Sequence, residues 1–382
     1  MPRPPLPAPN VADMPGAVFS RIAHKIRSHT GPLYPLHVGD TYLEPFAGGR
    51  MQDLRVEDHP GMHKYTSPQG LPALIDAAVE KVRRVNGLPA ERDQVLVTAG
   101  ATGGLGAAIG MLAAPGEEVL ILSPFWPLIR GIVQTFRAVP VEVPFFGVAH
   151  DARSAVEAVR ERITDKTVAL YVSTPSNPTG LVIPPDWLQA LAGLCRDRDL
   201  WVLSDEIYDR MVFRGEHASI GVFAPERTFS VFSFSKAYGM AGNRTGYVVG
   251  PRDAITNCRK ISTHTFYSAP TSGQLAGIAA LRDGEAWLQD VCARYQAAGD
   301  AAADVLGVDR PQGSTFLFLD VAHVLDERGV FGFLEDCLVE DGVLLAPGPS
   351  FGDYPTHVRL CFTSAPADEV DVAVRKLARR LD

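Results

Sequence analysis

The chain has 382 residues, of which 46% are hydrophobic and 21% are charged, and its formal net charge is −8. This is the composition of a globular protein with one large or two ordinary domains. The acidic charge, without a long basic run, argues against nucleic acid or a membrane as a partner. The longest nearly apolar run, Leu105–Ala114, is too short to span a bilayer. The five cysteines are scattered without a CxxC pair, and the proline-rich N-terminus lacks the apolar core of a secretory signal, so we expect a reduced cytoplasm.

Short β-rich runs alternate with helical patterns between about residues 95 and 250. The expected strands are Gln94–Thr98, Val119–Leu122, Val139–Val143, Val168–Ser173, Trp201–Ser204, Thr228–Phe232 and Tyr247–Val249, with helices such as Ser154–Ile163 and Asp186–Arg196 between them. This alternation predicts an α/β fold whose mostly parallel sheet is covered by helices on both faces. Ligands of such sheets gather at the carboxyl ends of the strands, so polar motifs that follow these runs should meet at one edge.

The two ends of the chain have a different pattern. The expected elements there are helices at Val18–Ser28, Ala286–Leu306 and Val330–Glu340, and strands at Phe316–Val321 and His357–Phe362. We therefore expect a large domain over residues 41–280. A smaller α+β domain would combine residues 1–40 with residues 281–382.

Lys236 stands among hydroxyl and small residues just after the apolar run Thr228–Phe232. Burial and the nearby Arg244 should both lower the pKa of this lysine, and a neutral amine is what attack on an aldehyde requires. Ser233, Ser235 and Arg244 are donors suited to a phosphate. Pyridoxal phosphate carries both an aldehyde and a phosphate, whereas the alternative is a solvated surface lysine in a glycine-rich loop.

Two further motifs follow expected strands. Asn177, in Ser-Asn-Pro-Thr-Gly, is either part of an ordinary Asn-Pro turn or a donor to a ligand oxygen. Asp205 is either a helix N-cap or a buried carboxylate that keeps a pyridine nitrogen protonated, which makes the ring a better electron sink. Tyr208 lies three residues on, within reach of the same ring, and Glu206 is interpreted as structural.

The glycine-rich stretch Gly100–Gly104 opens a helix after the first strand. Its small residues would let backbone N–H groups and the helix dipole meet a phosphate. The spacing Gly104-x-Gly106-x3-Gly110 superficially matches a nicotinamide-binding loop. That reading is disfavoured, because the glycines fall inside the helix and no acid follows the next strand to hold a ribose.

Three other positions have alternative interpretations. Trp126, which follows a strand and Pro124, could stack on a flat cofactor ring or pack in the core. Arg359 lies in a late strand and is either a surface cation or a forked donor for a substrate carboxylate. His59 and His63 are four residues apart, but Pro60 and Gly61 disfavour a helix there, so we expect no metal site.

Together these motifs resemble the class I/II aminotransferases, which are fold-type I, pyridoxal-phosphate-dependent enzymes. The resemblance runs from His37–Asp40 to Arg359 and includes the Ser-Asn-Pro-Thr-Gly segment, the Asp-x-x-Tyr pair and the Ser-x-Ser-Lys-x7-Arg run, in the expected order. It implies a seven-stranded, mostly parallel sheet between helices and a smaller domain from both chain ends. It also implies a homodimer with active sites at the subunit interface.

The resemblance assigns roles residue by residue. Lys236 would bind the cofactor through its aldehyde and later move a proton between the substrate Cα and the cofactor. Asp205 would pair with the ring nitrogen, and Asn177 and Tyr208 would bond the phenolic oxygen. Trp126 would stack on the ring. The residues assigned to the phosphate are Ala101, Thr102, Ser233, Ser235 and Arg244, with Tyr65 of the neighbouring subunit.

On the substrate side, Arg359 would bind the α-carboxylate and Gly39 would line the mouth of the site. The stretch Gly39–Pro45 departs from the family's usual Gly-Glu-Pro-Asp-Phe run. No matched motif supplies a cation for a second carboxylate; Arg50, Lys64 and Arg130 are candidates outside any motif. The expectation is therefore a mild preference for neutral or aromatic donors.

The expected reaction moves the amino group of an L-amino acid to a 2-oxo acid by a ping-pong mechanism through Lys236. Other pyridoxal phosphate reactions stay open on the same scaffold: a C–S β-lyase, a synthase of cyclic amino acids, or a decarboxylase. The cofactor motifs do not separate them, because substrate geometry decides the outcome. A transcriptional regulator is disfavoured, because the chain is acidic and too short for an added DNA-binding domain.

Overall fold

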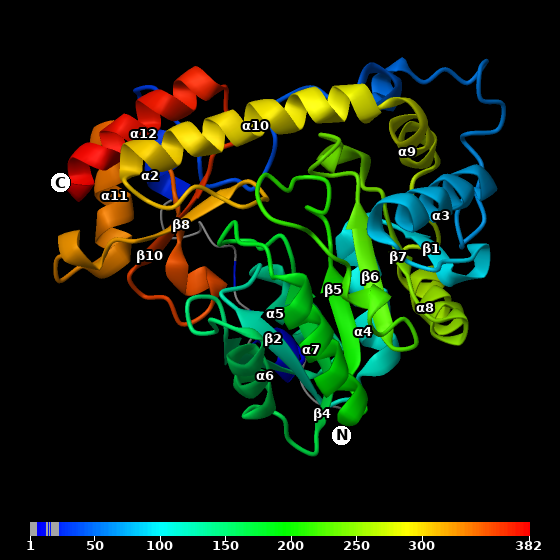
Figure 1. Ribbon diagram of the computed structural model, residues 1–382. Coiled ribbons are helices and arrows are strands. Elements are labelled where there is room, and N and C mark those ends of the chain that lie inside the picture. Colours follow the sequence, from blue (N-terminus) through cyan, green and yellow to red (C-terminus); the bar gives the residue numbers. More distant parts are fainter. Residues whose placement is uncertain (1–5, 13, 15, 17–22) are drawn as a thin grey trace.

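A computed structural model describes residues 6–12, 14, 16 and 23–382. Its central feature is a seven-stranded sheet in the order β1-β7-β6-β5-β4-β2-β3 (Figure 1). The strands are β1 Val95–Thr98, β2 Glu118–Ser123, β3 Val139–Pro144, β4 Thr167–Ser173, β5 Trp201–Asp205, β6 Thr228–Ser233 and β7 Gly246–Val249. Only β7 runs antiparallel to its neighbours. Each strand lies where the sequence predicted it, and the predicted fold class is confirmed.

Helices cover both faces of this sheet, because the strands are apolar on both sides. The helices are α3 Pro72–Asn86, α4 Gly100–Leu112, α5 Leu128–Thr135, α6 Ala152–Arg160, α7 Pro185–Asp197, α8 Arg252–Thr265 and α9 Thr271–Asp283. Helices α4, α5 and α8 pack with one set of alternating strand residues, such as Val119 and Ile121. Helices α6 and α7 pack with the other set, such as Leu120 and Leu122. The period of two thus directs alternate strand side chains to opposite faces of the sheet. Strand residues such as Val97 and Tyr247 form a further core with α3 and α9.

A smaller antiparallel sheet has the order β8-β10-β9. Its strands are β8 Phe316–Asp320, β9 Ala346–Pro347 and β10 His357–Cys361, and its helices are α10 Glu285–Leu306, α11 Gly329–Asp341 and α12 Ala367–Leu381. These helices share a core with the sheet. The long helix α10 runs from the large sheet to the small one and packs along α12 (Figure 1). The domain bounds at residues 40 and 280 stay a prediction.

The described N-terminal helices contact different parts of the chain. Asn10 in α1 (Pro9–Ala12) donates a hydrogen bond to the Gln134 carbonyl at the end of α5, at 3.1 Å. Lys25 in α2 (Ala23–Ser28) pairs with Glu335 of α11. Residues 18–22 of the helix predicted at Val18–Ser28 lie outside the described residues.

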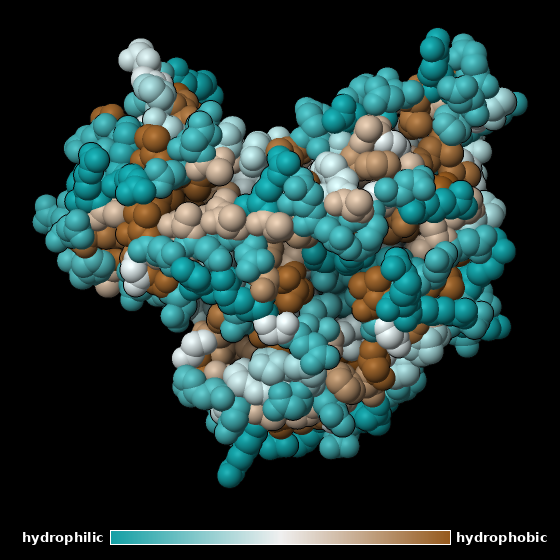
Figure 2. Space-filling model, turned by 45° about the horizontal axis from the view of Figure 1, so that its top comes forward, coloured by the Kyte–Doolittle hydropathy of each residue, from teal (hydrophilic) through white to brown (hydrophobic). Residues whose placement is uncertain are grey.

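The surface mixes polar and apolar residues. On the face in Figure 2, hydrophobic residues form separate patches among hydrophilic ones. Within the described ranges, no helix has both the length and the apolar character needed to cross a membrane. The described part of the chain also has short 3-10 helices at Ala47–Gly49, Met51–Asp53, Arg92–Gln94, Ile220–Val222, Ala241–Asn243, Ala322–Val324 and Gly348–Phe351.

Candidate active site

The predicted site residues meet in one cavity of about 340 Å³ at the carboxyl edge of the large sheet. All of them except Tyr65 line it: Gly39, Ala101, Thr102, Trp126, Asn177, Asp205, Tyr208, Ser233, Ser235, Lys236, Arg244 and Arg359. They come from the ends of β5 and β6, from the segments that follow β1, β2, β4, β5 and β6, and from β10 of the small sheet. Gly39 comes from the chain before the large sheet. The site therefore lies between the two sheets, where parallel strands end.

Lys236 lies three residues beyond the end of β6 and is mostly buried. Its amino group donates a hydrogen bond to the Gly39 carbonyl and lies 3.7 Å from Asp40 Oδ1. Burial lowers the pKa of Lys236, as expected from the sequence, although Asp40 opposes the shift. The cation that assists burial is Arg359 rather than the expected Arg244, whose Nη1 donates to the Ala241 carbonyl at 2.9 Å.

Asp205 ends β5 and is almost fully buried. Tyr171 donates its hydroxyl to Asp205 Oδ2 at 2.6 Å, whereas Oδ1 has no hydrogen-bond partner among the described residues. Burial raises the pKa of Asp205 to about 6, and the bonds from the Tyr171 hydroxyl and the Ile207 amide limit this rise. A buried carboxylate oxygen without a hydrogen-bond donor lowers the stability of the cofactor-free protein. The same oxygen is a suitable acceptor for a protonated ring nitrogen.

Tyr171 was missed in the sequence, because it lies inside the apolar run of β4. The register of the strands explains the contact. Tyr171 pairs with Leu203 of β5, two residues before Asp205, so the side chains of Tyr171 and Asp205 lie on the same face of the sheet. Glu206, interpreted as structural, is fully buried and accepts hydrogen bonds from Ser204 and Ser219.

A group of donors surrounds the N-terminus of α4 at one end of the cavity. Ser233 Oγ donates to Ser235 Oγ at 2.9 Å, and the Ser235 amide donates to Ser233 Oγ at 3.0 Å. Gly100 has φ +69°, and a Cβ added there would lie 2.6 Å from Arg244 Nη2. Glycine is thus required for the guanidinium to approach the helix. Backbone N–H groups, hydroxyls and a guanidinium together suit a phosphate dianion.

Arg359 comes from β10 and is only 6% exposed. Nη1 donates to Asn177 Oδ1 at 3.0 Å and Nη2 to the His37 carbonyl at 2.7 Å, while Nε has no hydrogen-bond partner in the described part of the chain. The guanidinium lies 4.2 Å from the centre of the Phe316 ring and 4.8 Å from that of Phe351. A planar cation held between two rings suits a planar carboxylate.

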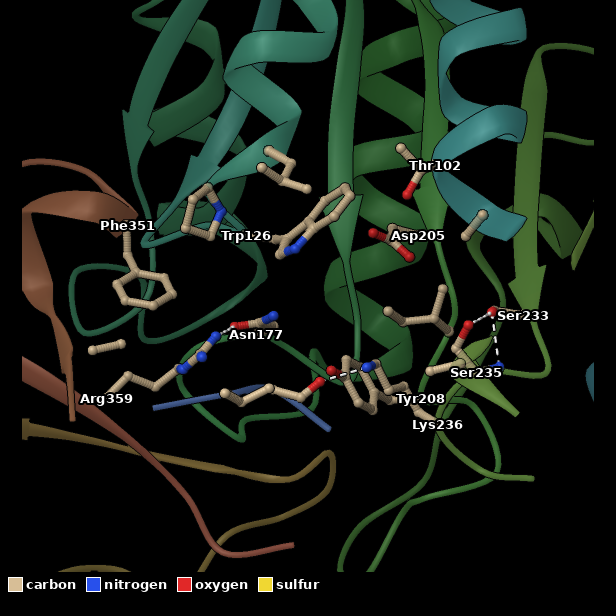
Figure 3. A pocket seen from close by; sticks show the side chains of 18 of the residues that line it. Thr102, Trp126, Asn177, Asp205, Tyr208, Ser233, Ser235, Lys236, Phe351 and Arg359 are labelled. Atoms are coloured by element: carbon tan, nitrogen blue, oxygen red, sulfur yellow. Dashed lines mark hydrogen bonds between the residues drawn. The ribbon is translucent and has the colours of Figure 1, made fainter. Parts of the chain in front are cut away.

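Figure 3 shows how these groups are distributed. Arg359 and Asn177 lie on one side of the cavity and Ser233 and Ser235 on the other, with the Trp126 indole between them. The site therefore presents a carboxylate-binding end, a flat aromatic surface and a phosphate-binding end. His37, Phe316 and Phe351 were not predicted, because no local motif marks packing between the two sheets.

Tyr65 is the one predicted residue outside the cavity. It is 88% exposed, and its ring packs edge-on against Tyr267 with 5.0 Å between centroids. Its assigned contact with a neighbouring subunit stays a prediction.

Comparison with known proteins supplies the family. The profile described as aminotransferase class I and II matches residues 35–377. The chain belongs to this family. It is a pyridoxal-phosphate-dependent aminotransferase, as the resemblance in its sequence implied.

Two relatives indicate the breadth of the match. The aspartate/prephenate aminotransferase of Thermus thermophilus is 34% identical over 332 residues, 84% of each chain. The aspartate aminotransferase of Geobacillus stearothermophilus is 32% identical over 335 residues, again 84% of each chain.

Solved structures agree with the fold. The Thermus thermophilus aspartate aminotransferase with maleate has a TM-score of 0.88 and 31% identity, covering 98% of this chain and 99% of the other. The aromatic aminotransferase of Pyrococcus horikoshii has a TM-score of 0.83 and 26% identity, covering 93% and 97%.

The aminotransferase site fits pyridoxal phosphate on its own geometry. The donors around α4 would hold the phosphate, and the unpartnered Oδ1 of Asp205 would face the ring nitrogen. The Lys236 amine would reach the aldehyde. The phosphate, the ring nitrogen and the aldehyde of the cofactor would thus each meet a complementary group in the same cavity.

Proposed function

We propose that this aminotransferase moves the amino group of an L-amino acid to a 2-oxo acid in two half-reactions of a ping-pong mechanism. The observation that carries the proposal is the convergence of Lys236, Asp205 and Arg359 on one cavity. Bound pyridoxal phosphate supplies an electron sink and carries the amino group. The protein's own residues bind and orient the substrate and move its proton.

Lys236 is the proton carrier in this proposal. Its buried amine has a lowered pKa, which favours the neutral base that removes the Cα proton. Arg359 binds the substrate α-carboxylate. Its hydrogen bonds to Asn177 and to the His37 carbonyl hold the guanidinium in the cavity, and the carboxylate can replace these acceptors. Asp205 would hold a proton on the ring nitrogen of the bound cofactor. Tyr208, buried against Phe316, would bond the ring hydroxyl together with Asn177.

The remaining site residues hold the cofactor or shape the mouth. Trp126 would stack on the ring, and Gly39 lines the substrate side of the cavity. The residues that would bind the phosphate are Ala101, Thr102, Ser233, Ser235 and Arg244. Their position beside the N-terminus of α4 supports this role.

A neutral or aromatic donor is the preferred substrate class. The cationic side chains that line the cavity, within the described residues, are Lys236, Arg244 and Arg359, and each already has a role. Burial and Arg359 lower the pKa of His37 to about 4, so its imidazole is neutral at pH 7. Within the described residues of one subunit, a second substrate carboxylate would find no further cation on the cavity wall, which offers Leu128 and other apolar side chains. The names of the relatives include aspartate and prephenate, so donor choice is the point to test.

The assembly and location belong to the same proposal. A homodimer would place Tyr65 at the phosphate of the partner subunit, and the strong exposure of Tyr65 supports this role. Residues 41–280 would form the large domain, and residues 1–40 with 281–382 the small one. All five cysteines are unpaired, which supports a reducing compartment such as the cytoplasm.

The test is a half-reaction on the purified protein loaded with pyridoxal phosphate. Single L-amino acids are added without a 2-oxo acid, and the cofactor absorption is followed. We expect neutral and aromatic donors to replace the aldehyde form by the amine form faster than aspartate does. Faster conversion by aspartate would contradict the donor preference. Release of pyruvate and ammonia from a cysteine conjugate, without amine-form cofactor, would contradict amino transfer and favour a lyase.

Replacement of the lysine tests its role. Lys236→Ala should abolish turnover and leave the fold intact, since the side chain lies at the cavity and outside the hydrophobic cores. Turnover and circular dichroism are the measurements. Near-normal turnover in a folded variant would refute the assignment.

A further inference from the structure

The segment His37–Tyr42, called here the mouth segment, borders the cavity through His37, Val38 and Gly39. The Tyr42 amide donates to the Thr363 carbonyl, and Thr363 Oγ1 donates to the Asp40 carbonyl, both at 2.8 Å. These bonds fix the mouth segment to the chain just after β10. The backbone that carries the Asp40 side chain is therefore held against the chain that follows β10.

The Asp40 carboxylate points from this segment to the amino group of Lys236. Its Oδ1 accepts a hydrogen bond from the Thr41 amide at 2.9 Å and lies 3.7 Å from Lys236 Nζ. Lys236 also donates to the adjacent Gly39 carbonyl. Among the described residues, Asp40 is the acid that forms an ion pair with Lys236. The mouth segment thus offers this amine both a carbonyl and a negative charge.

We propose that Asp40 is a positioning residue for Lys236, which draws the free amino group toward the mouth segment and favours its ammonium form. The inference rests on the proposed function, in which Lys236 alternates between a neutral base and a proton-bearing group. A lysine that has taken the Cα proton is stabilised by the carboxylate. Without Asp40, burial and Arg359 would lower the pKa of Lys236 further, because the main opposing charge is gone.

The charged and titratable groups that act on Lys236 come from two places, the mouth segment and β10. Asp40 on the mouth segment and Cys361 on β10 raise the pKa of Lys236, whereas Arg359 on β10 lowers it, as does burial. Asp40 is the half-exposed member of this set, with 49% of its side chain accessible, while Cys361 and Arg359 are buried. Solvent and salt therefore modulate the Asp40 contribution most directly.

The experiment measures the protonation of Lys236 in the full-length protein after removal of the cofactor. Competitive acetylation with acetic anhydride over a range of pH, read by mass spectrometry of the Lys236 peptide, gives an apparent pKa. Asp40→Asn should lower this pKa by about one unit, because an opposite charge at this distance favours the ammonium form. Asp40→Glu keeps the charge and should stay closer to the wild type.

Glu44→Gln is the matched control, because Glu44 is an exposed acid shortly after the mouth segment with no ion pair among the described contacts. It removes the same charge and should leave the pKa of Lys236 unchanged. An unchanged pKa in Asp40→Asn, or an equal shift in Glu44→Gln, would overturn the proposal.

A salt titration of the wild type gives an independent reading should Asp40→Asn fail to fold. Added salt screens the half-exposed ion pair, so the apparent pKa of Lys236 should fall as salt rises. A pKa that does not fall would count against Asp40. Neither assay uses substrate or cofactor, so failure of the amino-transfer proposal would leave both results readable.

Discussion

At the scale of single residues, the burial of Asp205 lowers the stability of the cofactor-free protein but prepares the site for its cofactor. Its carboxylate is almost fully buried with one oxygen unpaired, an arrangement that costs free energy until a cationic partner binds. Because folding raises the pKa from 3.8 to about 6, the folded chain binds the proton more tightly than the unfolded chain. The free energy of unfolding of the cofactor-free protein should therefore decrease as pH rises from about 4 to 6.

Asp205→Asn should remove this penalty. At pH 7 to 8 we expect the cofactor-free variant to gain roughly 2–3 kcal/mol in unfolding free energy, since a shift of about two units corresponds to that amount. The variant should also lose the stability change between pH 4 and 6, while its turnover falls by about a hundredfold or more, because the neutral amide cannot hold a proton on the ring nitrogen. Urea unfolding at several pH values checks the first part. An unchanged or lower stability at pH 7 would contradict the account.

The site residues that could be predicted from the sequence differ from those that could not in whether a local motif surrounds them. Lys236, Asp205 and Asn177 stand in short motifs at or shortly after strand ends, so their neighbours in sequence indicate their roles. Tyr171 acts through a hydrogen bond across neighbouring strands, and Phe351 acts by packing on Arg359 between the two sheets. Nothing adjacent to them in the chain marks that role.

At the scale of elements, the N-terminus of α4 depends on Gly100. The position combines φ +69° with an approach of Arg244 that leaves no room for a Cβ. Apolar runs of four to seven residues made the strands of the large sheet predictable. In contrast, β9 has two residues and forms by pairing with Val358 and Arg359 of β10. A strand of this length is too short to show a periodic pattern in the sequence.

Gly100→Ala should displace the Arg244 guanidinium and weaken pyridoxal phosphate binding by roughly tenfold or more, with a stability loss of about 1–2 kcal/mol from the left-handed backbone. Gly106→Ala in the same helix is the control, because no atom lies within 4 Å of its added Cβ. That control should bind the cofactor normally. Titration of both cofactor-free proteins with pyridoxal phosphate distinguishes them, and equal affinities would argue against the phosphate cradle.

At the scale of the whole molecule, the site exists because two sheets meet. Strand ends of the large sheet supply the cofactor groups, and β10 supplies Arg359. The order of motifs was sufficient to predict this fold class and most of the cavity. The contact between the sheets was not predictable in detail, since the mouth segment and β10 are more than 300 residues apart.

Subunit mixing tests the proposed dimer. Lys236→Ala and Tyr65→Ala each damage one part of a shared site, so mixed dimers should contain some sites with both residues intact. At limiting cofactor, the mixture should exceed the summed activities of the two variants after exchange of subunits. Purely additive activity, in a protein shown to be dimeric and to exchange, would place Tyr65 outside the neighbouring site.

The most direct measurement is reductive trapping of the cofactor. The protein is loaded with pyridoxal phosphate, reduced with borohydride, digested and mapped by mass spectrometry. We expect one reduced phosphopyridoxyl group, attached to Lys236. Attachment to another lysine, or none in a folded and loaded protein, would contradict the assignment on which the proposed reaction depends.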